Sequence, residues 1–551
     1  GTNGSASRST SDYIDNLVEL TADWHKMIGK HNLGAIIGYN YEDQMSESFS
    51  ASNSDFPTDS YSYNKLQAGN SLVKGNASMS SYKETEKLIG LFARATWNYD
   101  DRYLLMFSLR REGSSKFGAN NRWGYFPSVS ASWLITNESF MRGQDVVKEL
   151  KLRAGYGVTG NMPGDCYPWI GRMSKNEDYA YFGNDKVATW SLATVPNPNL
   201  KWETKHEINV GVDFSFLNGR LSGALDYYNR TTRDLLYWYA VDASKYEAGS
   251  MLLNLGSLQN QGVELALTGV AVERKNFVWN LGLTMAHNKN KVLSLGNDEF
   301  TFPEADKQRG GVGDGSVGWT SQKFQILEVG ESVGNFYGFK YAGQDANGKF
   351  YGYNINGDIV EWSKLKNEDK VILGNALPII TWGLSSSMSF YNVDFSFNLR
   401  GAIGGKLLNQ KRLAYGNKSS LASGNMIVSP DNGLTPPKVM TDYYLESGTF
   451  AKLGDVTIGY TSKLNDDVKK YLKDAKVISF DFETAPDDNY RDEPMAAIDA
   501  HKAHIVGVSF SVEEGTGIYA PIAHKNTELN LDMIELLREF SESSAVKIAH
   551  N

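Results

Sequence analysis

Long stretches of the sequence alternate strictly between apolar and polar residues, the pattern of β-strands that have one apolar and one polar face. Between Ile208 and Phe216 every second residue is apolar, and the residues between them are polar or glycine. Asn218-Gly219 follows, which is the pair typical of tight hairpins, and the alternation resumes from Leu221 to Tyr227. The sequence therefore predicts one continuous, strongly curved antiparallel sheet over residues 85–464, in up-and-down order.

The predicted strands over residues 201–217 and 218–240 exceed the five or six residues usual in globular proteins. Long two-faced strands fit a membrane-spanning barrel with a wet lumen. Aromatic residues near strand ends suit the bands that face membrane interfaces. These residues are Trp97, Tyr99, Tyr103, Trp123, Tyr125, Phe126, Tyr237, Trp238 and Tyr239. A soluble β-sandwich or β-helix, with the aromatics packed across strands, would show the same alternation.

Composition narrows these alternatives only partly. A length of 551 residues is enough for one large barrel and a small domain. The net charge of −9 argues against a broad nucleic-acid-binding surface built on charge alone. Cys166 is the single cysteine, so the chain forms no internal disulfide, and we interpret it as a core or loop thiol. No apolar run reaches the length of a transmembrane helix, and residues 1–5 do not begin a signal peptide.

Several longer motifs follow one another along the first part of the chain. They are Arg122–Ser130 with Trp133 and Asn137–Met141, Leu150–Gly157 with Thr159–Asn161, Asn197–Glu203, Asp226–Arg230 with Asp234–Leu236, Gly262–Glu264, and Phe450–Tyr460. In this order, over about residues 10–470, they resemble the SusC/RagA-like TonB-dependent outer-membrane transporters.

The resemblance implies a transmembrane β-barrel, located in the outer membrane and surrounded by its lipid, that imports oligosaccharides or peptides. It also implies a SusD-like surface lipoprotein and a TonB system as partners. Barrels of this class have about 22 strands, and the period-two runs indicate roughly fourteen. The family's plug domain would precede residue 1 and its last strands would follow residue 475. We therefore expect residues 1–475 to form a partial barrel with unpaired edges near Leu17 and Tyr460.

Two long insertions, residues 161–199 and 297–333, show little periodicity and are interpreted as extracellular loops. Within the second, Gly313–Gly318 formally fits G-x-G-x-x-G. A nucleotide site would need a strand before this motif and a helix after it. Since neither pattern is present in the sequence, we interpret the motif as loop.

The sequence changes character near residue 476. All 12 tryptophans lie between Trp24 and Trp382, so the last part of the chain has none. Three short apolar runs, an amphipathic run and a fourth apolar run predict the order β-β-β-α-β. They are Lys476–Phe482, His504–Val512, Thr516–Ala523, Leu531–Phe540 with Asn530 as N-cap, and Val546–Ala549. This pattern indicates a second, small α/β unit over residues 476–551.

Asp481 and Glu483 lie two residues apart on the first of these strands, so both carboxylates project to one face. Paired carboxylates suit hard divalent cations, and two such ions can drive phosphodiester hydrolysis. An isolated Asp-x-Glu pair is more often a solvated strand edge. His501, His504 and His524 lack further ligands nearby in the sequence and are interpreted as surface or turn residues.

Four runs near the C-terminus, Ile478–Thr484, Ile505–Ser511, Tyr519–His524 and Val546–Asn551, resemble the 3′–5′ proofreading exonuclease domain of family A DNA polymerases. The resemblance implies a ribonuclease-H-like fold, Mg²⁺ or Mn²⁺ as cofactor, a single-stranded DNA 3′ end as partner, and a cytoplasmic location. Asp481 and Glu483 match the first motif as catalytic and metal-binding residues, and Thr484 and Asn551 would contact nucleic acid. The next carboxylate of the family pattern would lie beyond Asn551, so we expect no DNA cleavage.

Three hypotheses follow: a transport protein, a DNA polymerase-associated 3′–5′ exonuclease, or a chimera of both. The junction Leu472–Val477 contains no linker of Gly, Ser or Pro. We interpret the chain as a chimera in which residues 1–475 are a partial transporter barrel and residues 476–551 a truncated exonuclease-like domain. We expect neither part to be active as it stands.

Overall fold

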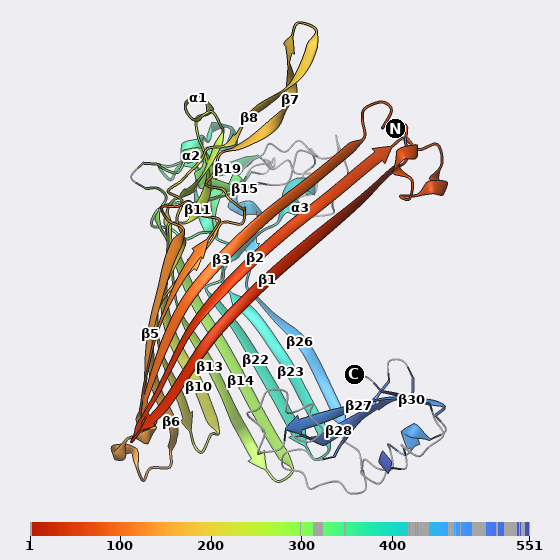
Figure 1. Cartoon of the computed structure of the whole chain (residues 1–551). Helices are drawn as coiled ribbons and strands as arrows, with labels where there is room; N and C mark the ends of the chain where they lie inside the picture. Colours follow the sequence, from red (N-terminus) through yellow and green to blue (C-terminus); the bar gives the residue numbers. More distant parts are fainter. Residues whose placement is uncertain are drawn as a thin grey trace. The chain divides into compact units, whose positions relative to one another are not determined.

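Figure 1 shows the chain as a computed structural model. The structure describes residues 3–297, 299–311, 323–345, 349–416, 418, 425, 427, 440–460, 468, 470–473, 475–486, 503–513, 516–522, 537, 538, 540 and 546–549. It divides into two compact units, and the second holds residues 272–279, 386–397 and 455–551.

The main element is a 13-stranded sheet whose strands pair in the order in which they follow along the sequence. The strands are β1 Ser5–Ile28, β2 His31–Ser54, β3 Ser78–Tyr99, β4 Tyr103–Ser114, β5 Trp123–Leu134, β6 Val147–Asn161, β9 Glu203–Phe216, β10 Leu221–Arg233, β13 Ser257–Arg274, β14 Phe277–Ser294, β22 Ile380–Phe390, β23 Val393–Ile403 and β26 Phe450–Tyr460. From β1 to β13 every neighbouring pair is antiparallel.

This arrangement confirms the up-and-down order expected from the alternation. The sheet has 13 strands where the sequence indicated roughly fourteen. It begins at Ser5, well before residue 85, and residues 461–464 lie outside the described part of the chain. As expected, β1, which holds Leu17, and β26, which ends at Tyr460, are the first and last strands of the order.

Most connections alternate between short and long along the sheet, as in outer-membrane barrels with short periplasmic turns and long extracellular loops. Residues 115–122, at the long-connection end, and residues 135–146, at the short-connection end, are of intermediate length. The short ones cover residues 29–30, 100–102, 217–220, 275–276 and 391–392. The long ones cover residues 55–77, 162–202, 234–256, 295–379 and 404–449. Asn218-Gly219 lies in a tight hairpin at the short-connection end, as predicted. Asn218 and Gly219 have φ values of 57° and 87°, and Leu217 joins them at 54°.

The two faces of the sheet differ in chemistry, and we call them the apolar face and the polar face. The apolar face exposes large hydrophobic side chains along many strands, listed here from β1 to β13: Val18, Leu20, Ile37, Leu91, Leu105, Phe107, Val129, Leu152, Ile208, Val210, Leu225 and Val263. The polar face carries residues such as Asn40, Arg153, Asp213 and Asp226. An apolar surface of this extent requires an apolar partner, and lipid supplies one.

A row of aromatic rings crosses the apolar face at its short-connection end. Trp97, Tyr99, Tyr103 and Trp133 follow one another with centroid separations of 6.2, 6.3 and 6.4 Å. His31 extends the row, since the Trp97 indole Nε1 donates to its Nδ1 at 3.0 Å. Trp97, Tyr99 and Tyr103 thus gather on one face near the strand ends, as the predicted interfacial band requires.

The other predicted aromatic bands were wrong in part. Phe126 turns away from its neighbours Trp123 and Tyr125, because successive strand residues face opposite sides, and its ring packs on Trp202. Tyr237 and Tyr239 lie in a long connection, where their rings pack on Phe302 and Phe300 at 4.5 and 5.4 Å. These residues stabilise the connections rather than a membrane interface.

The long connections form small sheets of their own, although the sequence suggested irregular loops. Their strands are β7 Arg172–Phe182, β8 Asp185–Thr194, β11 Leu236–Ala240, β12 Ser250–Asn254, β15 Gln308–Gly311, β16 Lys323–Ile326, β17 Asn335–Gly338, β18 Tyr341–Gln344, β19 Phe350–Tyr353, β20 Ile359–Glu361, β21 Val371–Asn375, β24 Lys406–Leu408 and β25 Leu445–Ser447. Short helices accompany them: α1 Ala243–Tyr246, α2 Glu304–Lys307 and α3 Gln410–Tyr415. The Gly313–Gly318 motif lies outside the described residues. No helix in the part of the chain that the structure covers is long and apolar enough to cross a bilayer.

The C-terminal region forms a separate four-stranded sheet in the order β29-β28-β27-β30. Its strands are β27 Val477–Pro486, β28 Ala503–Ser511, β29 Ile518–Pro521 and β30 Val546–Ala549. β27 pairs antiparallel with β28 and parallel with β30. A parallel pair cannot be joined by a tight turn and needs a longer crossover connection. Between β29 and β30, Leu537, Arg538 and Phe540 are helical. The described elements thus agree with the expected β-β-β-α-β order.

The core of this small sheet is dry and includes a residue that precedes the predicted boundary at residue 476. Val508, Phe510 and Ile478 are almost fully buried, and Phe540 packs on them. Val468 is also fully buried in this core, with Tyr471 and Leu472 against it. The division into residues 1–475 and 476–551 stays a prediction.

Candidate functional site

An ion-pair network crosses three adjacent strands on the polar face of the large sheet. Arg153 on β6 donates from Nε and Nη2 to the two carboxylate oxygens of Asp213 on β9, both at 2.7 Å. Its Nη2 also donates to Asp226 on β10 at 3.1 Å. Between them stands Gly211, where a Cβ would lie 2.3 Å from the Asp226 carboxylate and 2.9 Å from the guanidinium. The network therefore depends on a glycine at that position.

A second charged group lies on the same face, on strands nearer the N-terminus. Arg110 on β4 donates to both carboxylate oxygens of Glu112 at 2.8 and 2.9 Å and to the amide oxygen of Asn40 at 3.0 Å. Gly90 on β3 makes room for this contact, because a Cβ there would stand 2.0 Å from the Asn40 side chain. The polar face thus presents organised charges and amides, which suits a wall that faces water and polar solutes.

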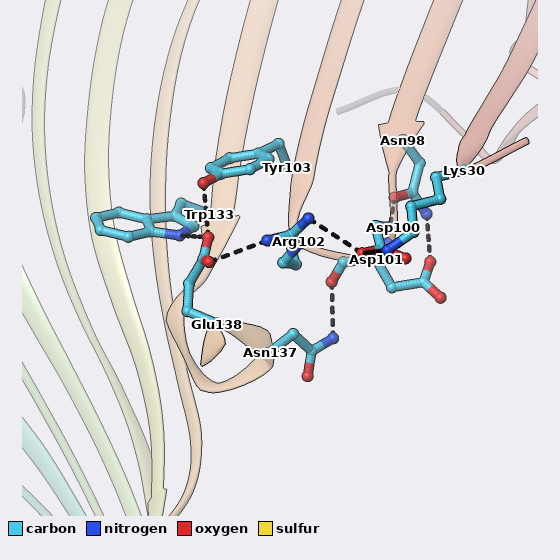
Figure 2. Close-up of polar contacts among 9 residues, drawn as sticks. All are labelled: Lys30, Asn98, Asp100, Asp101, Arg102, Tyr103, Trp133, Asn137 and Glu138. Atoms are coloured by element: carbon cyan, nitrogen blue, oxygen red, sulfur yellow. Dashed lines mark hydrogen bonds and ion pairs between the residues drawn. The ribbon is translucent and has the colours of Figure 1, made fainter. Parts of the chain in front are cut away.

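Glu138 forms the centre of a further network at the short-connection end of the sheet (Figure 2). It lies between two short 3₁₀ turns, Ile135–Asn137 and Ser139–Met141. One carboxylate oxygen accepts from the Tyr103 hydroxyl at 2.6 Å and from the Trp133 indole at 3.1 Å. The other accepts from Arg102 at 3.1 Å. These donors hold the pKa of Glu138 below its usual value, with the Tyr103 hydroxyl as the largest cause.

The same network ties together the connections of three hairpins. Arg102 pairs with Asp100 at 3.0 Å, and Lys30 donates to Asp100 at 2.7 Å. The Asn137 amide donates to the Asp101 carbonyl at 2.8 Å (Figure 2). Residues 29–30, 100–102 and 135–146 are therefore fixed to one another by charged and polar groups. Glu138 belongs to the family motif Asn137–Met141, but the motif alone does not predict this role.

A hydrophobic cluster lies at the long-connection end of the large sheet. Phe117 and Leu200 are fully buried, and Phe126 and Trp202 pack against them. The Trp202 indole donates to the Arg122 carbonyl at 3.1 Å, which anchors the connection before β9 to the connection before β5. This cluster gives the long connections a fixed base on the strands.

In the C-terminal unit, Asp481 and Glu483 lie on one face of β27, as the spacing predicted, and both are exposed. The Tyr519 hydroxyl donates to a Glu483 carboxylate oxygen at 3.0 Å. Gly507 stands opposite Glu483 on β28, and a Cβ there would lie 2.0 Å from that hydroxyl. Burial, followed by the bond to Glu483, raises the pKa of Tyr519 to about 12. Tyr519 belongs to one of the motifs identified in the sequence, but its contact with Glu483 could not be predicted, because the contact depends on the register of three strands.

The other residues expected at this site are placed only in part. Thr484 follows Glu483 on β27 and is exposed, whereas Asn551 lies outside the described residues. Across the described ranges, no group of three or more His, Cys, Asp or Glu side chains is arranged to hold a metal ion. The assignment of Asp481 and Glu483 as metal ligands stays a prediction.

Comparison with known proteins addresses the large sheet. Residues 1–399 match the family model of the TonB dependent receptor-like β-barrel. The chain belongs to this family. Its barrel is an outer-membrane barrel of the SusC/RagA-like kind, so that resemblance is confirmed. The family match ends at residue 399, and the exonuclease interpretation of residues 476–551 stays a prediction.

Two curated relatives show the extent of the similarity. TonB-dependent receptor P3 of Formosa agariphila is 28% identical over 524 residues, which cover 90% of this chain and 51% of the relative. TonB-dependent receptor SusC of Bacteroides thetaiotaomicron is 31% identical over 402 residues, which cover 69% of this chain and 38% of the relative. The chain spans about half the length, or less, of these relatives.

A solved structure shares the fold of the large sheet. A chain in the structure of the RagAB peptide importer in the "closed-closed" state superposes with a TM-score of 0.69 at 22% identity. The match covers 92% of this chain and 52% of that one. At this identity the likeness establishes the fold of the barrel wall.

Proposed function

We propose that the 13-stranded sheet is the wall of a TonB-dependent transporter that imports oligosaccharides or peptides across the outer membrane. The observation that carries the proposal is the division of the sheet into an exposed apolar face and a polar face with organised charges. Val210 and Ile208 on β9 are each 50% exposed on the apolar face. Asp213, on the same strand, binds Arg153 on the polar face. A wall between lipid and a water-filled passage needs this arrangement.

The family supports two partners for this transporter. The relatives are TonB-dependent receptors by name, and one is SusC. A protein with a similar wall is a peptide importer described as RagAB. We therefore propose a TonB system as the energy source and a SusD-like surface lipoprotein as the partner at the long-connection end.

Because the chain as it stands is expected to be inactive, uptake by cells that produce this wall within a full-length transporter of the family tests this function. Cells with and without TonB would receive either a labelled oligosaccharide mixture or a labelled peptide mixture. We expect accumulation of one of the two classes, lost when TonB is absent. Equal accumulation in both strains, or in cells without the protein, would contradict the proposal. The two mixtures decide between the two substrate classes.

A second candidate function concerns the C-terminal unit, where we propose that Asp481 and Glu483 hold one hydrated Mg²⁺ or Mn²⁺. Two exposed carboxylates on one strand face fit the oxygen ligands that these ions prefer. The strand order β29-β28-β27-β30 supports the ribonuclease-H-like interpretation of this unit. Such an ion, when bound, activates water for attack on a phosphodiester. Since no third His, Cys, Asp or Glu joins Asp481 and Glu483 among the described residues, we predict metal binding without DNA cleavage.

Two measurements on the full chain test this prediction. Mn²⁺ binding followed by electron paramagnetic resonance should weaken in Asp481→Asn and remain in Asp369→Asn, a control far away in the sequence. Incubation with labelled single-stranded DNA and Mg²⁺ should leave the DNA intact. Stepwise shortening from the 3′ end, abolished by Asp481→Ala, would show that the exonuclease alternative is correct and active.

A further inference from the structure

A cavity of about 490 Å³ lies at the long-connection end of the large sheet. It is lined by β3, by the connection that leads from β6 to β7 and by the first residue of β7. The lining residues are Tyr82, Lys83, Glu84, Thr85, Cys166, Tyr167 and Arg172. Its volume is in the range of small-ligand sites. Long connections of outer-membrane barrels face the exterior, so this cavity lies where an incoming solute would arrive.

The cavity lies beyond the lipid-facing band of β3. On the apolar face of that strand the side chains are hydrophobic from Ile89 to Trp97. Towards the N-terminal end of the strand, Lys87 pairs with Asp43 at 3.7 Å and Lys83 pairs with Glu47 at 2.9 Å. Ion pairs on this face mark the end of the lipid band. Tyr82 and Glu84 lie on the polar face of β3, nearer its N-terminal end than Lys87. They are therefore accessible from water.

The loop that closes one side of the cavity is held in place by buried contacts. Lys116, which is 8% exposed, pairs with Glu86 of β3 at 2.9 Å and donates to the Gly164 carbonyl at 3.3 Å. The Trp169 indole donates to the Ser115 carbonyl at 3.1 Å. Both bonds attach residues 162–171 to the connection between β4 and β5. A preformed wall of this kind lowers the ordering cost of binding.

Tyr167 has a left-handed backbone with φ of 52°, a conformation that disfavours residues with a Cβ. Such strain persists only where the surroundings impose it, and it is common at ligand sites. The neighbouring Cys166 is buried, and burial raises the pKa of its thiol to about 11. The thiol is therefore neutral at physiological pH and adds no charge to the cavity.

The remaining groups of the cavity have complementary chemistry. Glu84 accepts a hydrogen bond from the Tyr82 hydroxyl at 2.5 Å. The Arg172 side chain is exposed and makes no ion pair or hydrogen bond with the part of the chain that is described. The tyrosine rings of Tyr82 and Tyr167 supply flat apolar surface. The cavity thus combines the Glu84 carboxylate, the Arg172 guanidinium and two aromatic rings, whereas the Lys83 ammonium in its lining is already paired with Glu47.

We propose that this cavity is a substrate-binding site at the outer mouth of the transporter and that it takes short zwitterionic peptides. Arg172 binds the peptide carboxylate, Glu84 the ammonium group, and the tyrosine rings a side chain between them. A neutral oligosaccharide would offer no opposite charge to either Arg172 or Glu84, and an acidic one would use only Arg172. The inference rests on the transport function proposed above and names its substrate class.

Calorimetric titration of the full chain in detergent with the tripeptide Gly-Leu-Gly tests this site. A doubly blocked form of the peptide, maltotriose and trigalacturonate serve as comparison ligands. We expect the free tripeptide to bind most tightly. Arg172→Ala should weaken its binding about tenfold, the effect of losing one charge-assisted hydrogen bond. Arg142→Ala, the same charge change in the connection between β5 and β6, should leave binding unchanged.

Tyr167→Gly separates a binding role from a folding role. Glycine accepts the left-handed backbone without strain, so the variant should keep or gain thermal stability while peptide binding weakens. Equal affinity of wild type and Arg172→Ala for the tripeptide, or preferential binding of either sugar, would overturn the inference. In that case TonB-dependent uptake would still support the transport function. Loss of TonB dependence would instead contradict the transport function itself.

Discussion

The two sheets of this chain use similar alternating strands for opposite purposes. In the small C-terminal sheet the apolar side chains are hidden, with Val508 fully buried and Phe510 1% exposed. In the 13-stranded sheet the apolar side chains are displayed, with Ile37 62% and Phe107 50% exposed. Alternation fixes which residues share a face, but the partner of that face, a protein core or lipid, comes from the surroundings.

This difference between the two sheets predicts that truncating a large hydrophobic side chain destabilises the small sheet more than the large one. Of the changes we consider, this should have the largest effect on stability. Phe510→Ala removes a ring that packs on Phe540 at a centroid distance of 5.1 Å, and should destabilise the small sheet by about 3–5 kcal/mol. Phe107→Ala on the apolar face should have a much smaller effect in detergent, because no protein cavity is left behind.

Two probes can follow the sheets separately in one sample. All 12 tryptophans lie between Trp24 and Trp382, so denaturant titration by tryptophan fluorescence reports on the large sheet and its long connections. Hydrogen exchange of residues 477–486 and 503–511 reports on the small sheet. Equal sensitivity of both sheets to truncation would mean that the apolar face of the large sheet is packed against protein.

A charge on the apolar face should be harmful for the same reason, with the next largest effect. Val210→Arg places a cation in the middle of β9 on the lipid side, where it should cost about 2–4 kcal/mol. Asn209→Arg, one residue away on the polar face, is the control and should be tolerated. Urea unfolding in lipid vesicles measures both. Tolerance of Arg at residue 210 would argue that this face meets water.

Much of the large sheet could be predicted because its signals are local. The alternation from Ile208 to Phe216, the Asn218-Gly219 turn and the aromatic pair Trp97 and Tyr99 each depend on a few neighbouring residues. Phe126 could also have been placed correctly, since it follows Tyr125 directly and must face the opposite side of β5.

Other features depend on register between distant segments and could not be predicted. The β7–β8 hairpin was missed because its register shifts twice, between Arg172 and Met173 and between Lys175 and Tyr179, which breaks the period of two. The contact of Tyr519 with Glu483 joins residues 36 positions apart. In the candidate mouth cavity, β3 residues meet a loop about eighty residues later, which no local pattern indicates.

The ion pairs on the polar face of the large sheet should stabilise the protein less than the buried core of the C-terminal sheet does. Arg153→Ala removes a bidentate pair, leaves Asp226 without this cation and leaves Asp213 with only the more distant Lys151 at 3.9 Å. Because the Arg153 side chain is 32% exposed, water screens the pair, and we expect a loss of about 1 kcal/mol. Arg153→Lys keeps the charge without the two-pronged geometry and should lose less. Denaturation in low and high salt measures the difference, which a purely packing role for Arg153 would leave unchanged.

The smallest effect on stability should come from the Glu138 network at the short-connection end, where polar contacts rather than buried apolar side chains hold the connections together. The pKa of Glu138 is lowered in the folded protein by Tyr103, Trp133 and Arg102, so its ionised form stabilises the fold. That contribution is complete above the unfolded value of about 4.3 and disappears as the pH falls through the lower folded value. Hydrogen exchange of residues 100–102 and 135–146 should therefore accelerate below about pH 4. Glu138→Gln should be equally fast on both sides of that range, whereas Glu149→Gln, an exposed control, should behave like the wild type. A pH response that survives Glu138→Gln would assign the effect to another carboxylate.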